Sequence, residues 1–225
     1  MEAVIPVSIQ PLIDAYLRAL EPLQTHFYGI YIAGSIALGA FEELESDIDL
    51  IALTQGEGSS LELKQLKALH THLIKTSPFG KRLEVSYIPT RYLGVMHPDK
   101  QSGAVVPYPV LHNSKFSPAS YGSLEAVTWW IIKHNGLRLL GLERSELPLE
   151  VAWKDVLTTM RFNLDVYFAR QAKRPYLYLN DVAVEFAVTN LCLILTTIEE
   201  GEIISKSASL MRWRDRLPEF ESGFA

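Results

Sequence analysis

The sequence predicts a chain in two parts, an α/β part with a small mixed sheet followed by an all-helical bundle. In the first part, segments rich in β-branched and aromatic residues alternate with segments of helical periodicity, the pattern of helices packed on a sheet. Residues 97–122 hold four prolines and little periodicity, which indicates a long connection. After this connection the periodicity is helical. We therefore predict two domains, 1–118 and 119–225.

The first part is expected to hold, in chain order, a helix, two strands, a second helix and a third strand. The predicted ranges are 8–22 for the first helix, 27–34 and 47–54 for the two strands, 59–75 for the second helix and 82–88 for the third strand. The second helix opens on Ser59, with Glu62 three residues later, which is a capping-box pattern. The two central strands carry apolar residues on both faces, so helices are expected to pack on the sheet.

The second part is predicted to contain four helices. Their ranges are 123–136, 149–173, 181–201 and a last helix that begins at 205. Gly136 and Gly201 end the first and third of them, since glycine adopts the backbone conformation that commonly closes a helix.

Composition limits the classes of function. The formal net charge is −5, which argues against a protein built to coat nucleic acid. Cys192, the single cysteine, lies in an apolar run and fits a reducing cytosol. We find neither a signal-peptide pattern at the N-terminus nor an uninterrupted apolar run of the length that spans a membrane. A cytoplasmic protein that does not enter a membrane is therefore expected.

Two acidic residues, Asp47 and Asp49, interrupt an otherwise apolar strand, DIDLIALT. Side chains at positions i and i+2 of a strand point to the same face, so the two carboxylates are close neighbours. Without a counter-charge they would repel each other. Mg²⁺ prefers such oxygen ligands and is usually held by one or two carboxylates plus substrate phosphates. The pair therefore predicts a magnesium site.

Gly34-Ser35 and Glu84 lie near this pair in the predicted topology. Glycine allows the backbone to approach a ligand closely, and amides at the start of a following helix offer donors to a phosphate. Glu84 is a charged residue in the third strand. If that strand neighbours the strand of the aspartates, Glu84 approaches them and can act as a general base beside a metal.

These residues carry a resemblance to a known family. Gly34-Ser35, ten further residues, then Ser46-Asp47-Ile48-Asp49-Leu50, with Glu84 one strand later, resembles the polymerase β-like nucleotidyltransferase superfamily. The helical part, VTWWIIKHNGLRLLG followed by NLCLILTTIEEGEIISKSASLMRWRDRLPEF, resembles the C-terminal domain of aminoglycoside adenylyltransferases, which modify streptomycin and spectinomycin. The likeness covers residues 27–219.

The resemblance implies an enzyme that transfers AMP from ATP to a hydroxyl of a small polar acceptor, such as spectinomycin, and so confers antibiotic resistance. It implies that Asp47 and Asp49 bind Mg²⁺ and that Glu84 is the general base. The residues implied in triphosphate binding are Gly34, Ser35, Ser46 and, from the helical domain, Lys206. Asp181 is implied in binding an ammonium group of the acceptor, although it is also placed to be the N-cap of a helix.

Departures from the family pattern leave other functions open. The region VLHNSKF lacks the tryptophan of the streptomycin enzymes, and Leu193 replaces a usual arginine. Relatives also continue with a further helix after the LPEF stretch, so an incomplete helical domain, or one covered by a partner, is expected. One alternative function is therefore a non-catalytic nucleotide-binding or interaction protein. Another is an adenylyltransferase that acts on a protein or RNA partner.

Overall fold

The computed structural model describes residues 3–57, 59–96, 107–120 and 125–216. It divides into two compact units, Met1–Ala152 and Trp153–Ala225. This division differs from the predicted boundary between residues 118 and 119. The reason is that the segment following residue 124 begins with a helix, α4 (Ala126–Asn135), and a strand, β6 (Leu137–Gly141), that belong to the first unit.

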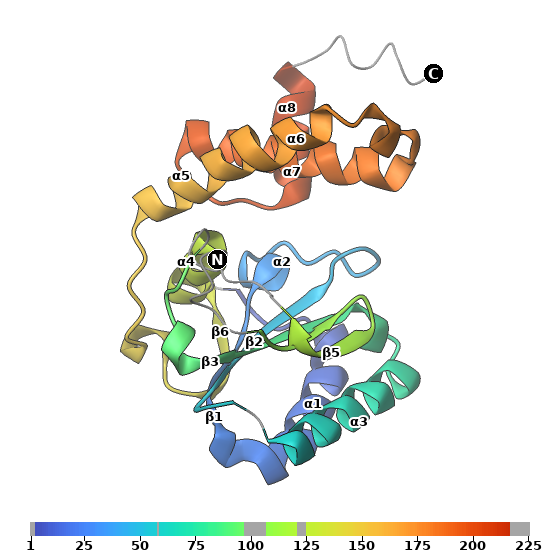
Figure 1. The fold of residues 1–225 in the computed structure, drawn as a ribbon, viewed down its shortest axis with the longest axis vertical. Helices are drawn as coiled ribbons and strands as arrows, with labels where there is room; N and C mark the ends of the chain where they lie inside the picture. Colours follow the sequence, from blue (N-terminus) through green and yellow to red (C-terminus); the bar gives the residue numbers. More distant parts are fainter. Residues whose placement is uncertain (1–2, 58, 97–106, 121–124, 217–225) are drawn as a thin grey trace. The chain divides into compact units, whose positions relative to one another are not determined.

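A six-stranded mixed sheet forms the centre of the first unit (Figure 1); the sequence predicted a mixed sheet, but with three of these strands. Its order is β5-β4-β3-β2-β1-β6. The strands are β1 (Phe27–Ile32), β2 (Ile48–Thr54), β3 (Leu83–Pro89), β4 (Tyr108–His112), β5 (Lys115–Ser120) and β6. β2 and β3 pair in parallel, while the other neighbours pair antiparallel. A helix, α3 (Ser60–Thr76), connects the two parallel strands, as such a crossover requires.

Three strands lie where the sequence analysis expected none. β4 and β5 form a hairpin inside the predicted long connection, and β6 directly follows α4. Pro109 and Pro118 had argued against strands in this region. Pro109 sits at a register irregularity of β4, and Pro118 lies in an edge strand, which are the two places where a sheet tolerates proline.

Two helices, α1 (Gln10–Leu20) and α3, share a core with one face of the sheet. Leu12 and Tyr16 of α1, Leu69 of α3 and Val85 of β3 are among its buried members. The predicted capping box at the start of α3 is confirmed: the Ser59 amide donates to Glu62 Oε2 at 2.5 Å, and the Glu62 amide donates to Ser59 Oγ at 3.3 Å.

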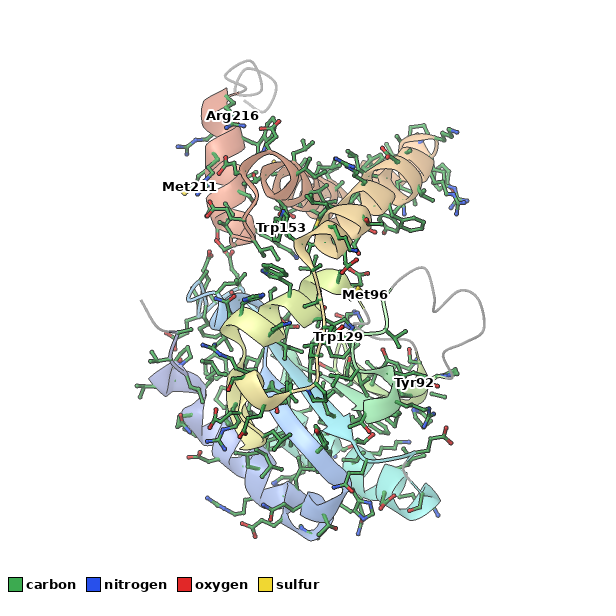
Figure 2. The ribbon with its side chains drawn as sticks, turned by 90° about the vertical axis from the view of Figure 1, so that its left-hand side faces the viewer. Tyr92, Met96, Trp129, Trp153, Met211 and Arg216 are labelled. Carbon is green, nitrogen blue, oxygen red and sulfur yellow. The ribbon has the colours of Figure 1, made fainter. Side chains whose placement is uncertain are left out.

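The other two helices of this unit, α2 (Gly34–Ala37) and α4, contact each other. Trp129 of α4 (Figure 2) is fully buried. Its indole N–H donates to the Val95 carbonyl at 2.7 Å. This tryptophan is therefore part of the core, and α4 is held against the segment that follows β3.

The second unit is helical. It contains α5 (Trp153–Phe162), a π-helical turn (Asn163–Phe168), α6 (Ala169–Ala172), α7 (Asp181–Glu200) and α8 (Lys206–Arg216), and α7 contacts both α5 and α8. Gly201 ends α7 with φ +70°, as predicted. Among the described residues, α7 alone has the length and apolar composition of a membrane span, a property that core helices of soluble proteins share.

A buried hydrogen-bonded chain crosses the core of the first unit. His70 Nε2 lies 2.7 Å from Tyr87 Oη, and Tyr16 Oη donates to the same oxygen at 3.2 Å. His70 is fully buried, stacked between the rings of Tyr16 and Phe116, and no residue that the structure describes pairs with its Nδ1. Burial disfavours the charged imidazolium and lowers the pKa of His70 from 6.5 to about 3.

This burial predicts a pH dependence of stability. Between about pH 3 and 6.5 the unfolded chain binds a proton at His70 that the folded chain does not. The free energy of unfolding therefore falls as the pH drops through this window, with a slope from this residue of about 1.4 kcal/mol per pH unit. In urea unfolding at pH 7, 6 and 5, His70→Gln is expected to lose this part of the slope. The exposed neighbour variant His72→Gln should keep it. Equal slopes in all three proteins would show that His70 is not buried in its neutral form.

Candidate active site

Asp49 and Glu84 meet at the start of the two parallel strands. The pairing of β2 with β3 sets Asp49 directly opposite Glu84. Neighbouring strands lie about 4.8 Å apart, and residues in parallel register point to the same face. Both side chains line one pocket of about 360 Å³. Other residues of its wall are Gly34 at the start of α2, Ser86 of β3, His112 of β4 and Thr128 of α4. The condition set in the sequence analysis, that the strand of Glu84 neighbours the strand of the aspartates, is therefore met.

Asp47 lies just outside the strand in which the sequence placed it. β2 begins at Ile48, so Asp47 is an exposed residue at its entrance, while Asp49 is partly buried. Strand alternation therefore does not fix the direction of the Asp47 side chain, and Asp47 is not among the residues that line the pocket. No group of three or more His, Cys, Asp or Glu side chains is gathered in metal-binding geometry within the described part of the chain. The structure thus brings Asp49 and Glu84 together but leaves Asp47 at the rim.

Gly34 packs its backbone against the Asp49 carboxylate. Its φ is +57°, and a Cβ at this position would lie 1.9 Å from Asp49 Oδ2. The preceding residue, Ala33, donates its amide to the Asp49 carbonyl at 2.9 Å. Only glycine combines this backbone conformation with this close approach. The turn between β1 and α2 is therefore fitted to the acidic side chain.

Ser35 presents a buried hydroxyl that lacks a partner. Its Oγ is inaccessible to solvent and makes no hydrogen bond with any residue that the structure describes. A buried hydroxyl without a hydrogen bond costs about 1–3 kcal/mol, so the position suits a ligand that would supply the partner. Ser46 differs, because its Oγ accepts a hydrogen bond at 2.9 Å from the Glu42 amide within the same loop.

Arg82 fastens the loop that leads into Asp47. Its Nε donates to the Ser46 carbonyl at 2.8 Å and its Nη2 to the Glu42 carbonyl at 3.1 Å, and its guanidinium also bonds the Glu43 carbonyl. The rings of Phe41 and Phe79 flank the guanidinium at 5.7 and 5.5 Å, within cation–π range. Arg82 lies two residues before Glu84, so one side chain links the strand of Glu84 to the loop of Asp47. No sequence pattern indicated this role of Arg82, because hydrogen bonds to backbone carbonyls do not depend on the type of the partner residue.

His112 is a further pocket residue that the sequence analysis did not single out. Its Nδ1 lies 2.7 Å from Glu84 Oε1, and the Asn113 amide N–H donates to the same oxygen at 3.4 Å. The imidazole is exposed, whereas the Glu84 side chain is only 23% exposed. The local signal for this contact was weak: Asn113 is of a residue type that tolerates the positive φ of a hairpin turn, but no glycine follows it.

Two predicted residues, Lys206 and Asp181, belong to the second unit, whereas the other predicted residues belong to the first. Lys206 is the exposed first residue of α8. Asp181 is the exposed first residue of α7. The N-cap of α7 is Asn180, whose side chain accepts from the Val182 amide at 2.9 Å, so Asp181 does not perform that role. Its carboxylate lies in the first turn, where it interacts favourably with the helix dipole.

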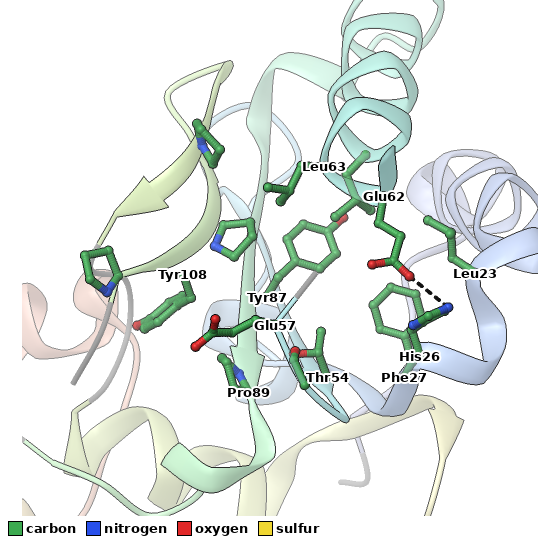
Figure 3. A pocket seen from close by; sticks show the side chains of 15 residues that line it. Leu23, His26, Phe27, Thr54, Glu57, Glu62, Leu63, Tyr87, Pro89 and Tyr108 are labelled. Carbon is green, nitrogen blue, oxygen red and sulfur yellow. Dashed lines mark hydrogen bonds and ion pairs between the residues drawn. The ribbon is translucent and has the colours of Figure 1, made fainter. Parts of the chain in front are cut away.

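A second pocket, of about 230 Å³, lies at the opposite ends of β2 and β3 (Figure 3). Its wall is largely aromatic and aliphatic, with Tyr87 and Tyr108 facing the same space. The two carboxylates there are already paired: Glu62 with His26 at 2.8 Å and Glu57 with Arg91 at 2.5 Å. It contains none of the predicted site residues, so the acidic pocket at Asp49 and Glu84 is the candidate active site.

Comparisons with known proteins agree with this architecture. No protein-family model matches the chain, and no curated protein matches it. The crystal structure of spectinomycin adenyltransferase AAD(9) from Enterococcus faecialis, with ATP and spectinomycin, superimposes with a TM-score of 0.66. The alignment covers 88% of this chain and 79% of that chain, at 16% identity. A toxin-antitoxin structure with AMP-PNP reaches a TM-score of only 0.33, too low to bear on the fold. The chain thus has an aminoglycoside adenylyltransferase-like fold, a mixed-sheet unit followed by a helical unit.

Proposed function

We propose that this protein is a nucleotidyltransferase that transfers AMP from ATP to a hydroxyl group of a small polar acceptor. The observation that carries this proposal is the register of Asp49 opposite Glu84, beside the Gly34 turn, in a fold shared with an ATP-using adenyltransferase. The acceptor we propose is an aminoglycoside or aminocyclitol such as spectinomycin, which the solved relative binds. A cytoplasmic location and a role in antibiotic resistance belong to the same proposal.

The residues of the pocket fit Mg²⁺ and a triphosphate. Asp49 of β2 and Asp47, two residues before it, would supply the hard carboxylate oxygens that Mg²⁺ prefers. Gly34 leaves the space that a side chain would fill, and the unpartnered Ser35 hydroxyl is a donor suited to a phosphate oxygen. When bound, the ion would neutralise charge on the triphosphate and align it. In this proposal Ser46 supports the same region through its loop.

Glu84 is the proposed general base. It would take the proton from the acceptor hydroxyl as that oxygen forms a bond to the α-phosphorus of ATP. The bond from the α-phosphorus to the bridging oxygen then breaks, and pyrophosphate leaves. The partly buried position of Glu84 at the floor of the pocket keeps its carboxylate oriented toward the space where both substrates would meet.

Two residues of the helical unit have proposed roles in substrate binding. We propose that Lys206 contributes a positive charge to the ATP phosphates, since a lysine at an exposed helix start is free to act as a mobile point charge. Asp181 would pair with an ammonium group of the acceptor.

A second candidate function is nucleotide binding without catalysis. The observation that favours it is the exposed Asp47, which the described structure does not gather with Asp49 and Glu84 into a metal-binding cluster. ATP binding without pyrophosphate release across a panel of aminoglycosides would support this candidate. Release only in the presence of a protein or RNA would favour a macromolecular acceptor instead.

Replacement of Asp49 tests the metal assignment. Wild-type protein with ATP, Mg²⁺ and spectinomycin is expected to release pyrophosphate, and a chelator should stop the release. Asp49→Asn should be at least about a hundredfold slower, because it removes a negative charge from the pocket. Asp14→Asn, which changes an exposed aspartate of α1, should retain wild-type activity. Wild-type rates in Asp49→Asn would show that Asp49 does not bind the metal.

Replacement of Gly34 tests the close approach of the turn to Asp49. Gly34→Ala would place a methyl group against Asp49 Oδ2, so we expect loss of activity as well as stability. Gly39→Ala is the matched control, because Gly39 has φ +66° but open space around it. This control should lose about 1–2 kcal/mol of stability from backbone strain and keep its activity. Pyrophosphate release and thermal unfolding are measured for both variants. Equal rates of pyrophosphate release would contradict the proposed role of the turn.

Replacement of Arg82 tests the anchoring of the Asp47 loop. A lysine has no planar fork and cannot reach three carbonyls at once. Arg82→Lys is therefore expected to raise the Mg²⁺ concentration needed for half-maximal activity, with a loss of rate of about tenfold to a hundredfold. Arg91→Lys, which changes an arginine paired with Glu57 near the other pocket, is the control. An unchanged Mg²⁺ dependence would show that the Asp47 loop does not depend on this anchor.

A further inference from the structure

Two donors converge on one oxygen of Glu84. The imidazole Nδ1 of His112 lies 2.7 Å from Oε1, and the Asn113 backbone N–H points to the same oxygen at 3.4 Å. Within the described residues, these contacts leave the other carboxylate oxygen, Oε2, to the pocket. An ionised carboxylate only accepts hydrogen bonds, so His112 must donate its Nδ1–H in this contact.

The Asn113 side chain supports the same assignment. Its Nδ2 lies 2.8 Å from His112 Nε2, at the far side of the imidazole ring. An amide nitrogen donates, so His112 Nε2 is the acceptor and carries no proton. With the Asn113 amide in this orientation, the two contacts match a neutral imidazole protonated at Nδ1. Asn113, His112 and Glu84 thus form a chain of oriented hydrogen bonds that ends at the candidate base.

The hairpin between β4 and β5 holds this chain in place. Its register pairs His112 with Lys115, so Asn113 and Ser114 form a two-residue turn, with φ values of +49° and +60°. Ser114 Oγ donates at 2.9 Å to the carbonyl of Lys81, close to the start of β3. The turn is therefore attached to the segment that leads into the strand of Glu84, which keeps the backbone of His112 beside that strand.

We propose that His112 is a positioning residue for Glu84, and that Asn113 fixes the imidazole in the Nδ1–H form. The pair holds Oε1 and directs Oε2 toward the hydroxyl of the acceptor. This inference rests on the proposed function and adds to it two residues that neither bind the metal nor react. An unoriented carboxylate would sample other rotamers, and a misplacement of about 1 Å can lower a rate about a hundredfold.

The kinetic test separates kcat from KM. His112→Ala is expected to lower kcat of pyrophosphate release by about tenfold to a hundredfold, with KM for ATP and acceptor changed less than about twofold. Asn113→Gly, which keeps the positive φ and removes the side chain, should show a smaller loss of kcat. His72→Ala, an exposed histidine of α3, is the control. When Glu84 is already replaced by glutamine, the additional change His112→Ala should cause no further loss of kcat. Full kcat in His112→Ala, or additive losses in the double variant, would overturn the proposal while leaving the nucleotidyltransferase function intact.

A second measurement keeps the inference testable if no acceptor supports turnover. The ¹⁵N chemical shifts of the His112 imidazole report its tautomer directly. We expect an Nδ1–H neutral ring in the wild type near pH 7.5, and a shift toward Nε2–H in Glu84→Gln and in Asn113→Gly. An imidazolium, or an Nε2–H ring in the wild type, would overturn the hydrogen-bond chain. An inactive wild type with the expected tautomer would instead count against the proposed function alone.

Discussion

The parallel pairing of β2 with β3 is the constraint on which the candidate site depends. It sets Asp49 opposite Glu84, and a shift of the register by one residue would send one of these side chains to the opposite face of the sheet. The register is fixed by burial, since Leu50 and Val85, which are also paired, are almost completely inaccessible and belong to the core under α1 and α3. The free energy gained by burying these apolar neighbours therefore also holds two carboxylates side by side. This arrangement would be unfavourable without a counter-charge.

Three irregular segments surround this pair, and each is fastened by a specific contact. The Gly34 turn rests on the Asp49 carboxylate, the Arg82 guanidinium holds the loop before Asp47, and the β4–β5 turn places His112 on Glu84. These contacts order segments that lack ladder hydrogen bonds of their own. A preorganised pocket of this kind is what charge stabilisation in a reaction requires, because the groups need not rearrange as the charge develops.

Part of this arrangement could be predicted from the sequence, because its signals are local. The strand run ending at Gly34, the acidic alternation of DIDLIALT, the Ser59–Glu62 capping box and the glycine that ends α7 each combine a recognisable pattern with a physical cause. The roles assigned to Asp47, Asp49 and Glu84 remain predictions. β6 was missed because a five-residue strand directly after a helix is too short to show a clear alternation of apolar and polar residues. The helix and strand that follow residue 124 belong to the first compact unit, so the division of the structure differs from the predicted boundary. The contacts of Arg82 and His112 join segments that are distant in the sequence. Arg82 bonds backbone carbonyls, which leave no sequence pattern. His112 lies in a hairpin whose prolines argued against strands.

The central claim is that Glu84, held beside Asp49, promotes transfer of AMP to a hydroxyl of a small acceptor. The most direct measurement is the mass of spectinomycin after incubation with the protein, ATP and Mg²⁺. The account predicts that the mass increases by one AMP group with the wild type and stays unchanged with Glu84→Gln, although that variant still binds ATP. Two results would contradict this claim. One is that the wild type modifies no acceptor across a panel of aminoglycosides, and the other is that Glu84→Gln modifies an acceptor at the wild-type rate.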